Sequence, residues 1–118
     1  MTVKECYEHM GADYEEVLRR LSSEALVKRF ALKFLNDKSF AELEKGLTDG
    51  DAENAFRGAH TLKGVCSNLG FRELYEVSSA LTEKLRGREI AGSEELFEQV
   101  KASYQKHIEA IQQLAQEA

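Results

Sequence analysis

The sequence contains no proline and only two cysteines, Cys6 and Cys66. The lack of proline over 118 residues argues against a loop-rich β fold and favours helices joined by short turns. Two cysteines do not make a disulfide framework, which favours the reducing cytoplasm as the location. No run of about 18 apolar residues is present, and the first ten residues are polar, so we expect neither a membrane span nor a secretory signal.

Basic residues are also fewer than acidic ones. The chain has 16 lysines and arginines against 21 aspartates and glutamates, for a net charge of −5. This balance disfavours nonspecific binding to nucleic acid. Neither GxxxxGK[ST] nor GxGxxG occurs, and the chain is short, so a self-contained ATP-using kinase is excluded. Its 42% hydrophobic content and its length fit a single folded domain over residues 1–118.

Helical periodicity runs through the whole chain. Three segments have the spacing of a capping box: Thr2–Glu5, Asp13–Glu16 and Ser39–Glu42. Further helices are expected to begin near Ser22, Asp51 and Ser93. Each larger helix has a single apolar stripe, which must be buried against its neighbours. We therefore predict an all-α fold: an antiparallel four-helix bundle over residues 22–117, with residues 1–21 forming one or two short helices across it.

The helix expected over residues 51–69 carries the most informative pattern. Its apolar residues recur at spacings of four, three, four and three: Ala55, Ala59, Leu62, Cys66 and Leu69. This stripe should face the core, with Cys66 as a small buried hydrophobe. At 100° per residue, His60 points about 160° away from the centre of the stripe. We therefore expect His60 to be exposed.

Small and basic residues share the face of His60. Lys63 and Gly64 follow it by three and four residues, and Ser67 lies one turn further. Glycine in mid-helix costs about 1 kcal/mol relative to alanine, so Gly64 indicates that space is needed there. A neutral imidazole can attack a phosphoryl group and hold it as a phosphoramidate, and a nearby lysine would attract the phosphoryl oxygens. An ordinary surface histidine is the competing interpretation, and we apply it to His9 and His107.

The string Ala-His-Thr-Leu-Lys-Gly at residues 59–64, followed by Leu69-Gly70, closely resembles the signature of histidine-containing phosphotransfer (HPt) domains. The family pattern is roughly A-H-x-L-K-G, four variable residues, an apolar residue and glycine. Every position of that pattern is matched. The resemblance extends more weakly over about residues 22–115.

The resemblance implies a four-helix bundle that carries phosphoryl groups and has no ATP-binding machinery of its own. His60 would be phosphorylated on the imidazole nitrogen farther from the backbone, taking the group from a receiver-domain aspartate and passing it to another. Lys63 matches the lysine near the phosphoryl group, and Gly64 matches the small residue that gives access. No cofactor is expected on this chain, because Mg²⁺ belongs to the receiver. Response-regulator receivers are the implied partners, with a hybrid sensor histidine kinase as a further candidate.

Two hydroxyl residues should lie level with His60. In an antiparallel hairpin that turns at Gly70, the facing level of the next helix is about Ser78 to Thr82. Either hydroxyl could orient the ring by a hydrogen bond, or it could simply be solvated.

Other residues near His60 have two possible roles each. Phe56, one turn earlier, either packs against an adjacent helix or joins an exposed patch that docks the partner. Arg57, and also Lys45 and Arg72, would add positive charge around the site or be ordinary solvated residues. Ser67 would belong to the same partner surface.

Two alternative functions remain open. The bundle could be a docking module for a receiver or kinase without being phosphorylated itself, or its histidine could be phosphorylated directly by an ATP-dependent histidine kinase. No metal site is expected, because Cys6 and His9 are two potential ligands without two more nearby. We also expect a monomer with neither nucleic-acid nor membrane partners.

Overall fold

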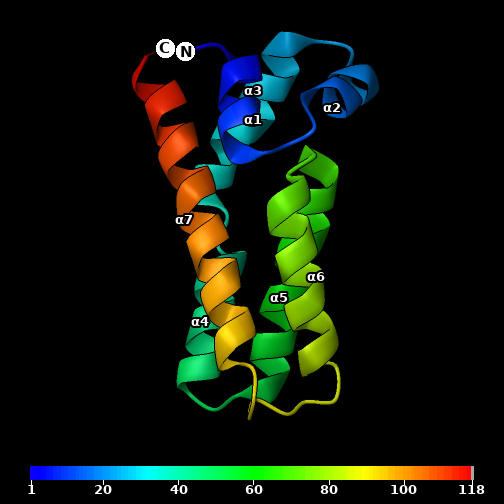
Figure 1. Ribbon diagram of the computed structural model, residues 1–118, viewed down its shortest axis with the longest axis vertical. Helices are drawn as coiled ribbons and strands as arrows, with labels where there is room; N and C mark the ends of the chain where they lie inside the picture. The colour runs from blue at the N-terminus through cyan, green and yellow to red at the C-terminus, as the bar shows by residue number, and fades with distance from the viewer. Residues whose placement is uncertain (118) are drawn as a thin grey trace.

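The computed structural model describes residues 1–117, and every regular element in that range is a helix. The elements are α1 (Val3–Met10), α2 (Tyr14–Leu21), α3 (Glu24–Lys33), the 3₁₀ turn η1 (Phe34–Asn36), α4 (Ser39–Thr48), α5 (Ala52–Leu69), α6 (Arg72–Leu85) and α7 (Glu94–Gln116). Figure 1 shows α4 to α7 as four antiparallel helices, with α1, α2 and the start of α3 gathered at one end. The predicted all-α bundle is therefore confirmed.

The longest helix, α7, has 23 residues and runs the height of the molecule beside a broken column formed by α3, η1 and α4 (Figure 1). The break falls before α4, where the Asp37 carboxylate accepts hydrogen bonds from the backbone N–H of Ser39, at 2.9 Å, and from its hydroxyl. The predicted capping box from Ser39 is wrong, because Ser39 already lies inside the first turn and is buried. The boxes predicted at Thr2 and Asp13 place their helix starts correctly: Thr2 forms a complete box, and Asp13 accepts from the N–H of Glu16.

Aromatic side chains join the short N-terminal helices to the bundle. Phe71 is fully buried, and its ring centroid lies 5.6 Å from that of Tyr7 and 5.2 Å from that of Phe34. Such tilted and edge-on contacts add to the stability that burial itself provides. The N-terminal helices therefore share one continuous core with α4 to α7.

The contact between α4 and α5 is made at the level of the backbone. A Cβ atom at Gly58 would lie 2.5 Å from the backbone nitrogen of Leu43, and one at Gly46 would collide with the backbone of Ala55. Both glycines are buried within helices, Gly58 in the middle of α5 and Gly46 in the last turn of α4, where glycine is otherwise less favourable than alanine. Each is required because the two helices approach too closely for a methyl group.

The N-terminal helices hold the C-terminal end of α5. The Tyr7 hydroxyl donates to the Leu69 carbonyl at 2.7 Å, Arg20 donates to the Asn68 carbonyl at 2.9 Å, and the Asp13 N–H donates to the Gly70 carbonyl at 2.8 Å. The last carbonyls of a helix have no partner within it, so these bonds satisfy groups that water would otherwise have to solvate. Residues 1–21 therefore serve to fasten the helix that carries His60.

One prediction concerns the two kinds of mid-helix glycine. Gly58→Ala should lower the free energy of unfolding by about 1–3 kcal/mol, because the new methyl group has no room against Leu43. Gly64→Ala should raise it by up to about 1 kcal/mol, because a Cβ there meets no atom within 4 Å. Urea denaturation of the matched pair measures both changes. Equal shifts for the two variants would show that the close contact does not govern stability.

The interpretation of His107 as a surface residue is wrong. Its side chain is fully buried in α7, 5.2 Å from the Phe71 ring centroid. Its Nδ1 lies 2.7 Å from the Ser103 carbonyl oxygen and so carries the proton, while Nε2 has no partner among the atoms of residues 1–117. Burial lowers the pKa of His107.

This burial predicts a pH dependence. The folded-state pKa of His107 lies below its ordinary value, so the unfolded chain binds a proton at a higher pH than the folded chain does. The free energy of unfolding should therefore fall as the pH is lowered from 7 towards 5. His107→Leu should flatten that slope, whereas His9→Gln, which alters an exposed histidine, should leave it unchanged. Urea titrations at three pH values test this, and an unaltered slope in His107→Leu would contradict it.

Candidate functional site

The helix α5 positions His60 by local rules. Asp51 accepts a hydrogen bond from the Asn54 N–H at 3.1 Å and caps the helix start, and Gly70 ends it with a φ of 70°. The buried residues of α5 are Ala55, Gly58, Ala59, Leu62, Cys66 and Leu69. His60 is exposed on the opposite side, so both the predicted helix and the predicted exposure are confirmed.

The approach to the His60 ring is open on one side. Gly64, one turn after His60, is exposed, and the space around its Cα is empty. Ser67, one further turn along, is exposed as well. Lys63 is half-buried and makes no ion pair among the described residues. The stripe therefore leaves room for another molecule to reach the imidazole, beside a lysine whose charge is not neutralised by contact.

Phe56 packs against the core, which is the first of its two expected roles, and cations lie over its ring as well. Its ring is partly buried against the core, and its centroid lies 5.8 Å from that of His60. From outside, the Arg88 guanidinium lies 3.9 Å from the Phe56 ring centroid and that of Arg86 lies 5.4 Å from it. Phe56 therefore packs within the bundle, and it does not form an open apolar patch, because two cations lie over its ring.

These two arginines come from the segment between α6 and α7, and they are held in place by carboxylates. Arg88 donates to Glu53 at 2.7 Å, and Arg86 donates to Glu83 at 2.6 Å. The hydrogen bond from Arg88 is the main cause that lowers the pKa of Glu53, and that from Arg86 does the same for Glu83. The charge of Lys63 also acts on Glu83, which places Lys63 in the same electrostatic neighbourhood.

Arg57 belongs to this group of charges through Glu53, its Nη2 lying 3.5 Å from a Glu53 oxygen. The three arginines contact two carboxylates, Glu53 and Glu83, and Lys63 adds a fourth positive charge without a salt bridge among the described residues. Sequence reasoning missed Arg86 and Arg88. The hairpin geometry that places Ser78 to Thr82 level with His60 also places residues 82 to 86 level with Phe56, and that signal could have found Arg86.

The two hydroxyl residues predicted beside His60 are directed into the bundle instead. Ser78 and Thr82 are both fully buried, so solvated hydroxyls are excluded. The Thr82 hydroxyl donates to the Ser78 carbonyl of its own helix at 2.7 Å, and the Ser78 hydroxyl has no partner among residues 1–117. Both lie on the buried face of α6 together with Leu74, Leu81 and Leu85. Neither makes a described hydrogen bond to His60.

Lys45 and Arg72 pair with aspartates outside this group of charges. Lys45 pairs with Asp49, the residue that follows α4, at 2.6 Å, and Arg72 pairs with Asp13. Cys66 is buried as predicted, and burial raises the pKa of its thiol. Cys6 is also fully buried, with its pKa raised to about 11. Within residues 1–117, no group of three or more histidine, cysteine, aspartate or glutamate side chains is placed to hold a metal ion.

Comparison with known proteins identifies the class of this bundle. A family model described as the Hpt domain matches residues 35–117, which is η1 from its second residue and all of α4 to α7. The chain therefore belongs to the Hpt domain family and is a histidine phosphotransfer module of two-component signalling. Domains of this family are phosphoryl carriers, generally not enzymes, and they interact with response-regulator receiver domains.

Searches among curated proteins and among solved structures found no match. No helix in the described part of the chain combines the length and the apolar character needed to cross a membrane. The match begins after α3, so α1, α2 and α3 lie outside the part of the chain that the family accounts for.

Proposed function

We propose that this chain relays phosphoryl groups between receiver-domain aspartates, with His60 as the carrier. The observation that supports this most directly is the orientation of α5, which buries its apolar side and presents His60 beside the empty space over Gly64. An acceptor that must enter the active site of another protein needs such access.

The transfer step follows from the chemistry of the ring. The attacking imidazole nitrogen needs its lone pair, so the ring reacts in its neutral form with the proton on the other nitrogen. The nitrogen farther from the backbone forms a bond to phosphorus as the bond between phosphorus and the aspartate oxygen breaks, which returns a free carboxylate to the receiver. Transfer to a second receiver is the reverse of this step with a new aspartate. The receiver supplies Mg²⁺, and this chain supplies the acceptor.

The cations near the His60 ring stabilise the negative charge of the phosphoryl oxygens during transfer. Lys63 shares the face of His60 and makes no competing ion pair among the described residues, so it is available to the phosphoryl oxygens. Arg86 and Arg88 are occupied by Glu83 and Glu53. They contribute a positive surrounding and cover Phe56, and we assign the direct contact to Lys63.

His60→Gln should abolish labelling of the chain by a ³²P-phosphorylated receiver domain. The free energy of unfolding should change by no more than about 0.5 kcal/mol, because the side chain is exposed. His9→Gln is the matched control and should retain full labelling. Undiminished labelling of His60→Gln would show that another residue is the acceptor. Labelling of the unaltered chain by a kinase with ATP, but by no receiver, would favour the direct kinase substrate.

Gly64→Gln and Lys63→Ala should both slow transfer, by different routes. Gly64→Gln places a side chain over the approach to the ring and should weaken receiver binding. Lys63→Ala removes a positive charge that favours transfer and should lower the transfer rate within the complex by about tenfold to a hundredfold. The effect is no larger because solvent at the open site weakens the attraction between the lysine and the phosphoryl oxygens.

Titrating the receiver in single-turnover experiments separates binding from the transfer rate. The free energy of unfolding of both variants should not fall below that of the unaltered chain by more than about 0.5 kcal/mol. Wild-type binding and transfer by Gly64→Gln would mean that access over Gly64 is not how the site works.

A further inference from the structure

The segment that includes α3 is basic, although the chain as a whole is acidic. Residues 19–38 contain six lysines and arginines and two aspartates and glutamates, whereas the whole chain has a net charge of −5. Most of this segment precedes the family match at residues 35–117. Its charge therefore has no explanation in the phosphotransfer bundle.

An apolar groove lies beside this segment. It has a volume of about 480 Å³ and is formed by the end of α2, by α3 with η1, and by the last turns of α5. Its apolar lining is Leu21, Phe30, Phe34, Val65 and Leu69. Phe30 is 37% exposed and is the one large hydrophobic side chain that is exposed among residues 1–117. The Lys33 ammonium lies 5.3 Å from the centroid of its ring.

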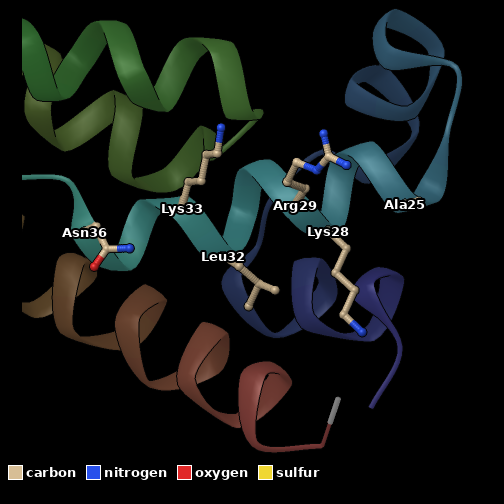
Figure 2. Close-up of a pocket in the computed structure, with 6 residues that line it drawn as sticks. All are labelled: Ala25, Lys28, Arg29, Leu32, Lys33 and Asn36. Carbon is tan, nitrogen blue, oxygen red and sulfur yellow. The ribbon is translucent and has the colours of Figure 1, made fainter.

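The cations of α3 are not neutralised by their own chain. Figure 2 shows Arg29 and Lys33 projecting from the same side of α3, towards the side on which α5 and α6 lie, while Lys28 and Leu32 project from another side. Among the described residues, Lys28, Arg29 and Lys33 take part in no salt bridge.

One carboxylate lies at the groove, and it is hydrogen-bonded to the start of α4. Asp37 lines the groove, and its carboxylate accepts two hydrogen bonds from Ser39. Arg20, at the other edge, donates to the carbonyls of Ser67 and Asn68 and pairs with Glu16 at 3.5 Å. The charge that the groove offers to an external carboxylate is therefore that of Arg29 and Lys33, two cations against the one negative charge of Asp37.

We propose that this groove binds an acidic amphipathic helix of a partner protein. Apolar side chains of that helix would enter the groove, and its carboxylates would face Arg29 and Lys33. The lining that α3 and η1 give to the groove runs from Phe30 to Asn36, and Arg29 comes one residue before it, so this side is about 10 Å long at the helical rise per residue. That length suits about two turns of a helix. The apolar lining favours a peptide over a nucleic acid, which would need a continuous positive surface instead.

The site is separate from the surface that a receiver would approach. Val65 lies about 140° round α5 from His60, and Leu69 lies on the opposite side. Gly64 does not line the groove, and Asn68, one turn after it, marks the nearest approach of the groove to the face of His60. The groove can therefore hold a partner while His60 exchanges its phosphoryl group, and it adds affinity that does not depend on phosphorylation.

A designed peptide tests this proposal. The probe is a fluorescein-labelled helix of 15 residues with leucines on one face and glutamates on the other, titrated with the full chain by fluorescence anisotropy. Arg29→Glu combined with Lys33→Glu should weaken its binding by at least about tenfold. The matched control, Lys84→Glu with Lys101→Glu, makes the same change in charge at two lysines that also lack salt bridges among the described residues, and it should weaken binding less than twofold. Amide NMR shifts should cluster at Phe30 and Val65.

Further probes decide between the groove and simple charge attraction. Replacing the leucines of the peptide by serine, or its glutamates by lysine, should each abolish binding. The proposal is overturned if the serine peptide binds as well as the original, if both double variants lose binding equally, or if the acidic peptide does not bind at all. Tighter binding of a single-stranded oligonucleotide or of anionic lipid vesicles would also overturn it, as would a self-associated chain whose own copies fill the groove.

Discussion

The backbone contact between α4 and α5 is the constraint on which the rest of the structure depends. Gly46 and Gly58 allow the two helices to approach until neither position has room for a methyl group. Because Gly58 must face Leu43 and Gly46 must face Ala55, the contact sets the rotation of α5 about its own axis. Ala55, Ala59 and Leu62 then complete the core, and His60 must lie on the outer side. The exposure of His60 therefore follows from packing on the other side of the same helix.

The remaining contacts hold that orientation and give the site its charge. Tyr7 and Arg20 bind the final carbonyls of α5, which gives the N-terminal helices a structural role outside the family match. At the other end, Arg88 reaches from the segment before α7 to Glu53 and covers Phe56. A supported helix, an open approach and a positive surrounding suit the phosphoryl carrier proposed above, because such groups must be held in place before a partner arrives.

Residues whose roles depend on local pattern could be predicted from the sequence, and those whose roles depend on a partner element could not. The stripe of α5 and the exposed His60 needed only helical periodicity. The role of Gly64 could be predicted because it follows a histidine by one helical turn. The role of Gly58 depends on Leu43, which packs against it only in the folded chain. The position of Arg88 over Phe56 depends on the path of the segment between α6 and α7, which helical periodicity does not predict. The burial of His107 could have been predicted from the sequence, because Val100 lies seven residues before it and Ile111 four residues after it on one helical face. The same spacing could have predicted the burial of Ser78, which follows Leu74 by four residues.

We propose that this bundle carries a phosphoryl group on one exposed imidazole and gives it back. The most direct test mixes the ¹⁵N-labelled chain with a phosphorylated receiver, locates the phosphoryl group by NMR of the histidine side chains, and then adds a second, unphosphorylated receiver. We expect one phosphoryl group on the His60 nitrogen farther from the backbone, none on His9 or His107, and its loss to the second receiver. A phosphoryl group found on another residue, or one that stays on His60 when the second receiver is present, would show that His60 is not such a carrier.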